Sequence, residues 1–203
     1  MIVGMWNKSV ILTYIGLAAA VFGICFSVSG IDLKFAMVCL IISGVADLFD
    51  GTVARRVKRT DEEKEFGVQI DSLVDVVSFI ALPITIFTSA GMNKRYHFLV
   101  FILFALCGIA RLGYFNVATA DMGKAVKYYT GLPVTYVALI FPLIYLAKLI
   151  VNENIFVIII TVSVLIVSAF EILKVKVIKP RGAAYAVFSI LAIAMLAVYL
   201  FVV

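Results

Sequence analysis

Long apolar stretches follow one another along almost the whole chain and restrict what it can fold into. A stretch of about 20 apolar residues is long enough to cross a bilayer as a helix. Of the 203 residues, 65% are hydrophobic, which is more than a soluble core needs. The sequence therefore predicts an all-α, polytopic transmembrane helix bundle in one domain, residues 1–203. The expected spans are residues 9–29, 34–50, 68–90, 97–117, 132–151, 154–173 and 183–203.

The first apolar stretch has some features of a signal peptide, since Lys8 precedes it and Ser27 and Ser29 resemble a cleavage site. Its apolar run is too long for a signal peptide, and further spans follow. We interpret it as the first transmembrane helix.

Lysine and arginine residues are distributed unequally between the two predicted sides of the membrane. With the N-terminus in the cytoplasm, thirteen of the seventeen fall on the cytoplasmic side. Cationic loops are disfavoured for translocation, so this bias places the polar ends of the second and third spans at the cytoplasmic face. The net charge of +5 favours contact with anionic membrane lipids. The sequence contains no motif for binding nucleic acid.

Four aspartates gather at these polar ends, Asp47 with Asp50 and Asp71 with Asp75. Residues three or four apart share one face of a helix, so each pair projects together. Unpaired carboxylates at the edge of the hydrocarbon layer are costly and repel one another unless cations neutralise them. The pattern therefore predicts a divalent metal site. Aspartate oxygens suit Mg²⁺ or Mn²⁺, with Ca²⁺ as a non-productive occupant, better than Zn²⁺.

Small residues and an arginine accompany the aspartates. Gly51 and Ala54 carry little side chain, and Arg55 lies two helical turns from Asp47. This combination suits a metal-bound diphosphate that approaches the backbone. Gly67, one turn before the second aspartate pair, either leaves room for that ligand or allows close helix packing.

The two segments together carry the pattern DxxDGxxAR…GxxxDxxxD over residues 47–75. This pattern resembles the signature of the CDP-alcohol phosphatidyltransferase family, and all eight of its positions match within 29 residues. The resemblance implies six core helices, here with about one extra, around a polar cavity open to the cytosol. It also implies a homodimer, and a reaction in which an alcohol displaces CMP from a CDP-linked lipid.

Carried over position by position, the resemblance assigns a role to each residue of the motif. Asp75 is the implied general base. The implied metal ligands are the four carboxylates, the last of them for a second ion: Asp47, Asp50, Asp71 and Asp75. The implied CDP-lipid site has small and cationic side chains: Gly51, Ala54, Arg55 and Gly67.

Two stretches further along, RLGYFN at 111–116 and GLP at 131–133, resemble those of the phosphatidylserine synthase branch. The match is partial, because Gly113 replaces an alanine and residues 134–136 replace small residues and a proline. Arg111 either holds the carboxylate or phosphate of an acceptor, or extends to the lipid headgroups. The acceptor site expected from this resemblance consists of Arg111, Asn116, Lys127, Gly131 and Pro133.

We therefore expect a multi-pass enzyme of the cell membrane, with its active site facing the cytoplasm, that transfers a phosphatidyl group from CDP-diacylglycerol to L-serine. The nearest alternative is the same chemistry with another alcohol, such as glycerol 3-phosphate, an inositol phosphate or choline, or with an archaeal CDP-lipid. An ion or proton transporter is the alternative from another class, since it too places aspartates within spans. The restriction of the aspartates to the ends of two helices disfavours a transporter.

Overall fold

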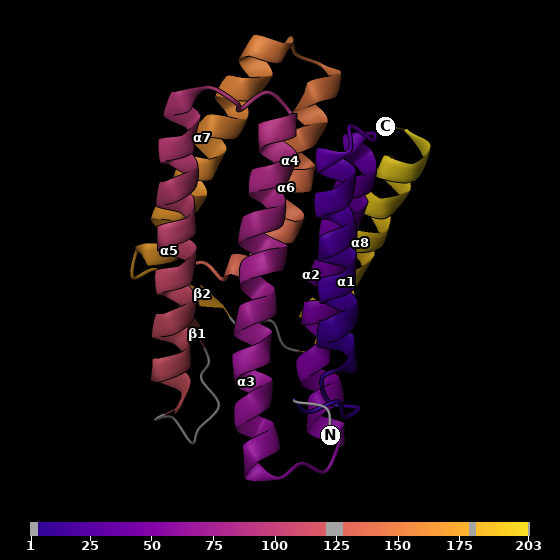
Figure 1. Cartoon of the computed structure of the whole chain (residues 1–203), viewed down its shortest axis with the longest axis vertical. Coiled ribbons are helices and arrows are strands. Elements are labelled where there is room, and N and C mark those ends of the chain that lie inside the picture. The colour runs from indigo at the N-terminus through magenta and orange to yellow at the C-terminus, as the bar shows by residue number, and fades with distance from the viewer. Residues whose placement is uncertain (1–3, 121–127, 179–181, 203) are drawn as a thin grey trace.

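The computed structural model describes residues 4–120, 128–178 and 182–202, which form an elongated bundle of helices (Figure 1). The bundle contains seven long helical runs and a short two-stranded sheet. In chain order its elements are α1 (Ile11–Val28), α2 (Leu33–Arg56), α3 (Asp61–Asp75), η1 (Val76–Ala81), α4 (Leu82–Ser89), α5 (Arg95–Ala120), β1 (Tyr128–Thr130), η2 (Val134–Tyr136), α6 (Val137–Tyr145), η3 (Leu146–Leu149), α7 (Glu153–Ile172), β2 (Lys176–Ile178) and α8 (Ala183–Phe201).

Six of the helical runs in the described residues are long and apolar enough to cross a membrane. The predicted all-α, multi-pass bundle is therefore confirmed. The stretch expected at 132–151 is helical as well, but its apolar helix, Val134–Leu149, is shorter than a full span. Tight 3₁₀ turns form both of its ends, and Pro142 inside α6 has no N–H to donate to the helix.

The polar connection between the second and third spans is mostly helical. α2 continues to Arg56, and α3 begins at Asp61, several residues before the apolar stretch. Thr60 and Glu63 form a capping box: the Glu63 N–H donates to Thr60 Oγ1 at 3.2 Å, and the Thr60 N–H donates to Glu63 Oε2 at 2.8 Å. Both halves of the aspartate motif therefore lie on well-formed helices.

A π-helical segment, η1, follows directly after Asp75. The Leu82 N–H donates to the Val77 carbonyl, five residues back. Pro83, the second residue of α4, has no N–H to donate, and the widened turn before it relieves the clash that its ring would cause in a regular α-helix. α3, η1 and α4 together form one continuous rod through the centre of the view in Figure 1.

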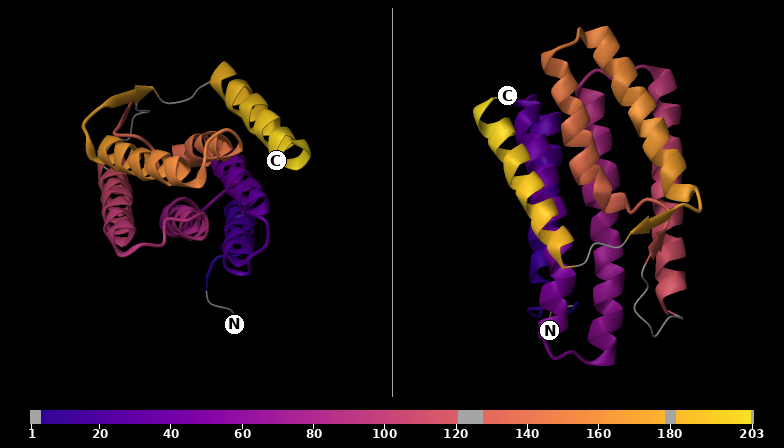
Figure 2. Two further views of the ribbon diagram at one scale, coloured as in Figure 1. Left: turned by 90° about the horizontal axis from the view of Figure 1, so that it is seen from above. Right: turned by 180° about the vertical axis from the view of Figure 1, so that it is seen from behind.

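Close contact between α1 and α2 fixes the first wall of the bundle. A Cβ added to Gly16 would lie 3.2 Å from the Cβ of Ala46, so the two backbones approach closely at this point. The Ser43 hydroxyl donates to the Gly16 carbonyl at 2.9 Å across the same contact. Figure 2 shows α8 at the edge of the bundle, where it packs mainly against α2.

Aromatic side chains fill the core between the central and outer helices. Phe87 of α4 meets Phe141 of α6 edge to face, with ring centroids 4.9 Å apart. Phe104 of α5 contacts the same ring at 5.8 Å. These ring contacts join α4, α5 and α6 through apolar packing.

The two strands tie the segment that follows α5 to the end of α7. β1 and β2 pair antiparallel, with Tyr129 opposite Val177. The Gly131 N–H donates to the Val175 carbonyl, and the Leu132 N–H to the Phe170 carbonyl, both at 2.9 Å. With this pairing, β1 lies beside the lower half of α5 in Figure 1.

Replacing Gly131 with alanine should destabilise the fold. Gly131 has a φ of +77°, and a Cβ there would collide with the carbonyl oxygen of Glu171. The left-handed backbone alone costs a non-glycine residue roughly 1–2 kcal/mol, and the collision adds to it. Thermal unfolding in detergent should show a lower midpoint for Gly131→Ala.

Gly113→Ala is the matched control for this change. Gly113 lies in α5, and a Cβ there would meet no atom within 4 Å. Alanine is the better helix former by about 1 kcal/mol, so the midpoint should stay the same or rise. Equal midpoints for the two variants would contradict the strain at Gly131.

Candidate active site

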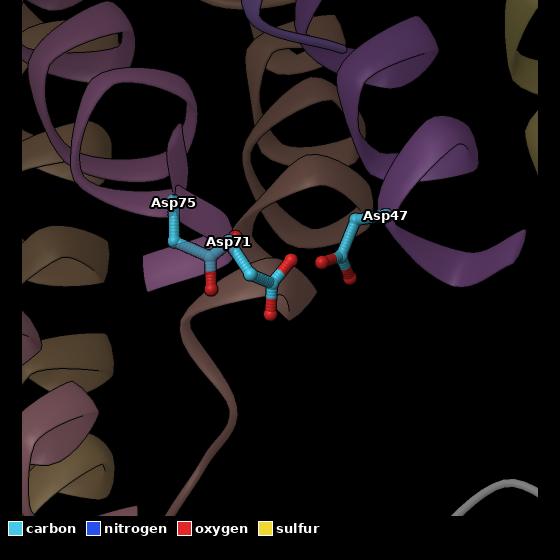
Figure 3. A group of neighbouring side chains, drawn as sticks. All are labelled: Asp47, Asp71 and Asp75. Atoms are coloured by element: carbon cyan, nitrogen blue, oxygen red, sulfur yellow. The ribbon is translucent and has the colours of Figure 1, made fainter. Parts of the chain in front are cut away.

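Three aspartates converge between α2 and α3. One carboxylate oxygen from each of Asp47, Asp71 and Asp75 lies within 4.8 Å of the others. Figure 3 shows Asp47 facing the other two across the gap between the helices. Asp71 and Asp75 share one face of α3 because they are four residues apart. The cluster is only partly open, since Asp75 is buried.

Asp50, the fourth aspartate of the motif, is not part of this three-residue group. Its Oδ2 accepts a hydrogen bond of 3.0 Å from the Thr13 hydroxyl of α1, and its carboxyl group lies against that of Asp71. Asp50 thus sits beside the cluster, where α1 holds it.

The three clustered carboxylates match the ligand chemistry of a hard divalent cation. Their donor atoms are all oxygens, which Mg²⁺, Mn²⁺ and Ca²⁺ prefer. In the described part of the chain, no lysine or arginine lies within ion-pair distance of them. A divalent cation would relieve the repulsion among these charges, so the residues present fit a metal ion.

A basic cavity of about 220 Å³ opens on one side of the aspartates. Thr13 of α1 lines it together with Ser9 and Val10, which precede that helix, and Asp50 and Asp71 line it as well. Its walls also contain three cations, Arg55, Arg59 and Lys64, and all four residues predicted to bind the CDP-lipid: Gly51, Ala54, Arg55 and Gly67.

A second cavity, of about 320 Å³, adjoins the basic cavity. It shares Asp50, Gly51, Arg55 and Asp71 with the basic cavity. Its remaining polar wall includes residues of the aspartate cluster, α5, β1 and α8: Asp47, Asp75, Arg111, Asn116, Tyr129 and Tyr185. Asp50 and Asp71 therefore line both cavities, whereas Asp47 and Asp75 line the second one.

Aromatic rings position Arg111 in this second cavity. The guanidinium carbon lies 4.9 Å from the ring centroid of Phe115 and 5.9 Å from that of Tyr129. Such contacts favour a buried cation, and Arg111 is only 7% exposed. Burial raises the pKa of Tyr129 to about 12, despite the opposing effect of Arg111. The phenol therefore remains neutral at physiological pH.

The residues expected to bind the acceptor are only partly brought together. Arg111, Asn116 and Pro133 line the second cavity, and the Asn116 amide donates to Ser72 Oγ at 2.8 Å. Gly131 lies outside the walls of both cavities and packs on the end of α7. Lys127 lies outside the residues that the structure describes.

Several residues at the site carry no signal in the sequence. Thr13 reaches Asp50 across 37 positions, and Tyr129 and Tyr185 arrive from β1 and α8. Hydroxyl and phenol side chains are common on apolar helices and loops, so only their position in the fold singles them out.

Known proteins resemble this chain over most of its length. Residues 6–168 match the profile of the family described as CDP-alcohol phosphatidyltransferase. An archaetidylserine synthase of Methanothermobacter thermautotrophicus is 35% identical over 162 residues, 79% of this chain and 67% of that protein.

Two proteins named as CDP-diacylglycerol–serine O-phosphatidyltransferases are also similar. The Saccharomyces cerevisiae protein is 37% identical over 109 residues, 50% of this chain and 38% of that protein. The Methanocaldococcus jannaschii protein is 33% identical over 107 residues, 53% of this chain and 47% of that protein. In both cases the similarity covers less than half of the relative.

Proposed function

The chain belongs to the CDP-alcohol phosphatidyltransferase family, and from this premise we propose that it transfers the phosphatidyl group of CDP-diacylglycerol to the hydroxyl of L-serine. The products are phosphatidylserine and CMP. The observation that carries the proposal is the position of the aspartates, at the boundary between a basic cavity and a second cavity that contains Arg111. A donor and an acceptor bound in the two cavities would meet at the carboxylates.

The basic cavity suits the diphosphate of the donor. Arg55, Arg59 and Lys64 supply positive charge for its phosphoryl oxygens. A Cβ on Gly51 would lie 3.4 Å from a nitrogen of Arg55, and one on Gly67 would lie 3.6 Å from a nitrogen of Arg59. Both glycines therefore border these guanidinium groups, which favours a role in ligand access for Gly67 over close helix packing.

The aspartates divide the chemistry between them. Asp47, Asp71 and, beside them, Asp50 would hold Mg²⁺ or Mn²⁺, and the ion would supply charge stabilisation to the diphosphate and to the departing CMP. Asp75 accepts the proton of the serine hydroxyl. The hydroxyl oxygen forms a bond to the lipid-bearing phosphorus, while the bond from that phosphorus to the oxygen of CMP breaks.

Arg111 makes serine the best-supported acceptor. A guanidinium can bind the serine carboxylate in a two-pronged contact. A phosphorylated acceptor would favour several convergent cations, whereas the described wall of the second cavity offers Arg111 and the shared Arg55. The names of the similar proteins from M. thermautotrophicus and S. cerevisiae also include serine.

The donor enters from the membrane. A small apolar cavity between α2, α6 and α8 shares Asp47, Leu48, Thr135 and Tyr136 with the second cavity, and it offers the lipid part of the donor a path to the aspartates. The protein acts in the cell membrane as a homodimer, in one domain, with both polar cavities facing the cytoplasm. The excess of lysine and arginine on that side supports this orientation.

Release of CMP by the purified protein tests the function. Serine should stimulate release from CDP-diacylglycerol with Mg²⁺ or Mn²⁺, and glycerol 3-phosphate, inositol phosphate and choline should not. A parallel assay with a CDP-linked ether lipid shows which donor the protein prefers. Release with another acceptor would overturn the serine assignment, and no release with any acceptor or donor would favour a transporter.

Removal of the metal should stop the reaction. EDTA is expected to abolish serine-dependent CMP release, because the clustered carboxylates alone would repel the diphosphate. Excess Mg²⁺ or Mn²⁺ should restore it, whereas Ca²⁺ should bind without restoring turnover. Unchanged release after EDTA treatment and gel filtration would contradict the metal assignment.

A further inference from the structure

Glu171 is a buried acid at the end of α7 that the proposed reaction does not use. Its side chain is 2% exposed. Neither carboxylate oxygen has a hydrogen-bond partner among the described residues. An isolated carboxylate in such a position is costly unless a nearby cation compensates its charge.

Arg111 is a buried cation that lines the same cavity as Glu171. A Cβ on Gly108 of α5 would lie 3.6 Å from Glu171 Oε2, so the carboxylate points to this part of α5. Arg111 follows three residues later on the same face of the helix. The Arg111 Nε has no hydrogen-bond partner among the described residues either.

Arg111 thus lies between two sources of negative charge. It lines the second cavity together with Asp75 and Asp47. Arg111 also lines a third cavity of about 200 Å³, whose wall includes Glu171. It therefore forms the partition between the aspartates and Glu171.

We propose that Glu171 is a positioning residue, which holds the Arg111 guanidinium back from Asp47 and Asp75. Without this pull, Arg111 would pair with the aspartates, compete with the divalent cation and withdraw from the acceptor. With it, the carboxylates remain available to the metal, and one edge of the guanidinium remains available to the second cavity. The part of this proposal that concerns the acceptor rests on the proposed function, whereas the part that concerns the metal does not.

The rings around Arg111 make the arrangement specific. Phe115 and Tyr129 favour a particular placement of the guanidinium group. The charge of Glu171 then determines whether the guanidinium lies closer to Glu171 or to the aspartates. Residues that orient a metal site from outside the ligand set typically change metal affinity or activity by about 10- to 100-fold when replaced. Loss of the Glu171 charge should have an effect of this size.

Binding of Mn²⁺ to the purified protein, followed by electron paramagnetic resonance without substrates, tests the proposal. Glu171→Gln keeps the shape and removes the charge, so it should weaken Mn²⁺ binding by about 10-fold or more. Glu171→Asp keeps the charge and should retain most of the affinity. In the Arg111→Gln background, Glu171→Gln should have no further effect, because the competing cation is absent.

Ser168→Ala is the matched control, since Ser168 is a buried polar residue of α7 whose hydroxyl bonds within its own helix, to the Val164 carbonyl. It should leave Mn²⁺ binding unchanged. Equal Mn²⁺ affinity in the wild type and Glu171→Gln would overturn the proposal. So would a loss that persists in the Arg111→Gln background, or an equal loss in Glu171→Asp. The double variant removes both buried charges, and therefore keeps the test valid if Glu171→Gln alone fails to fold.

Steady-state kinetics with serine test the acceptor part of the proposal separately from the metal part. In Glu171→Gln, the KM for serine should rise by about 10-fold or more, with a smaller change in kcat at saturating Mn²⁺. If serine proves not to be the acceptor, Mn²⁺ binding still tests the positioning role, because that experiment contains no substrate. Failure of the proposed function and failure of the positioning role are therefore distinguishable.

Discussion

Asparagine in place of Asp75 should slow CMP release by about 10²- to 10⁴-fold, the range expected for loss of a general base. The amide has nearly the same shape as the carboxylate but cannot accept the hydroxyl proton. Binding of the CDP-lipid should change much less, because the basic cavity that holds the diphosphate does not include Asp75. Single-turnover CMP release and equilibrium binding of the donor would separate the two effects.

Asp61→Asn is a suitable control for this variant. Asp61 begins α3, is exposed and pairs with Lys64 on the surface at 2.7 Å. Its replacement should leave turnover close to that of the wild type, since exposed ion pairs contribute little. Near wild-type turnover in Asp75→Asn would rule out Asp75 as the general base.

The architecture could largely be predicted from the sequence. Stretches such as residues 154–173 are apolar throughout and long enough to cross a membrane, so length and composition suffice to identify them. The position of Asp71 and Asp75 on one face of α3 follows from helical periodicity alone. The helix at Val134–Leu149 was harder to predict, because the stretch is apolar over the length of a span but forms 3₁₀ turns at both ends.

Contacts between distant segments could not be predicted in the same way. Thr13 and Asp50 lie 37 positions apart and meet only because α1 packs closely on α2. Asp50 fits the motif as well as Asp47 does, and only the fold places it beside the three-residue group. Glu171 stands alone at the end of an apolar span, and its significance depends on Arg111, which lines the same cavity from another helix.

Loss of the Asp47 charge should affect an earlier step than loss of the Asp75 charge. Asp47 is the member of the three-residue group that α2 contributes, opposite the two from α3. An Asp47→Asn variant keeps an oxygen there but loses the charge. Replacing a residue that only supports the ligands lowers metal affinity by up to about 100-fold, so losing this ligand's charge should lower the affinity for Mn²⁺ by at least that much. Titration of Mn²⁺ followed by electron paramagnetic resonance measures this, with Asp61→Asn again as the control.

The donor should then distinguish Asp47→Asn from Asp75→Asn. If the metal ion joins the diphosphate to the aspartates, Asp47→Asn should weaken metal-dependent binding of CDP-diacylglycerol as well as turnover, whereas Asp75→Asn should affect mainly turnover. Mn²⁺ at high concentration should recover part of the activity of Asp47→Asn, because a weakened site can still be filled by mass action. It should not recover that of Asp75→Asn, which lacks a proton acceptor. Equal recovery of both variants would mean that the two carboxylates share one role, and the division of labour proposed between α2 and α3 would be wrong.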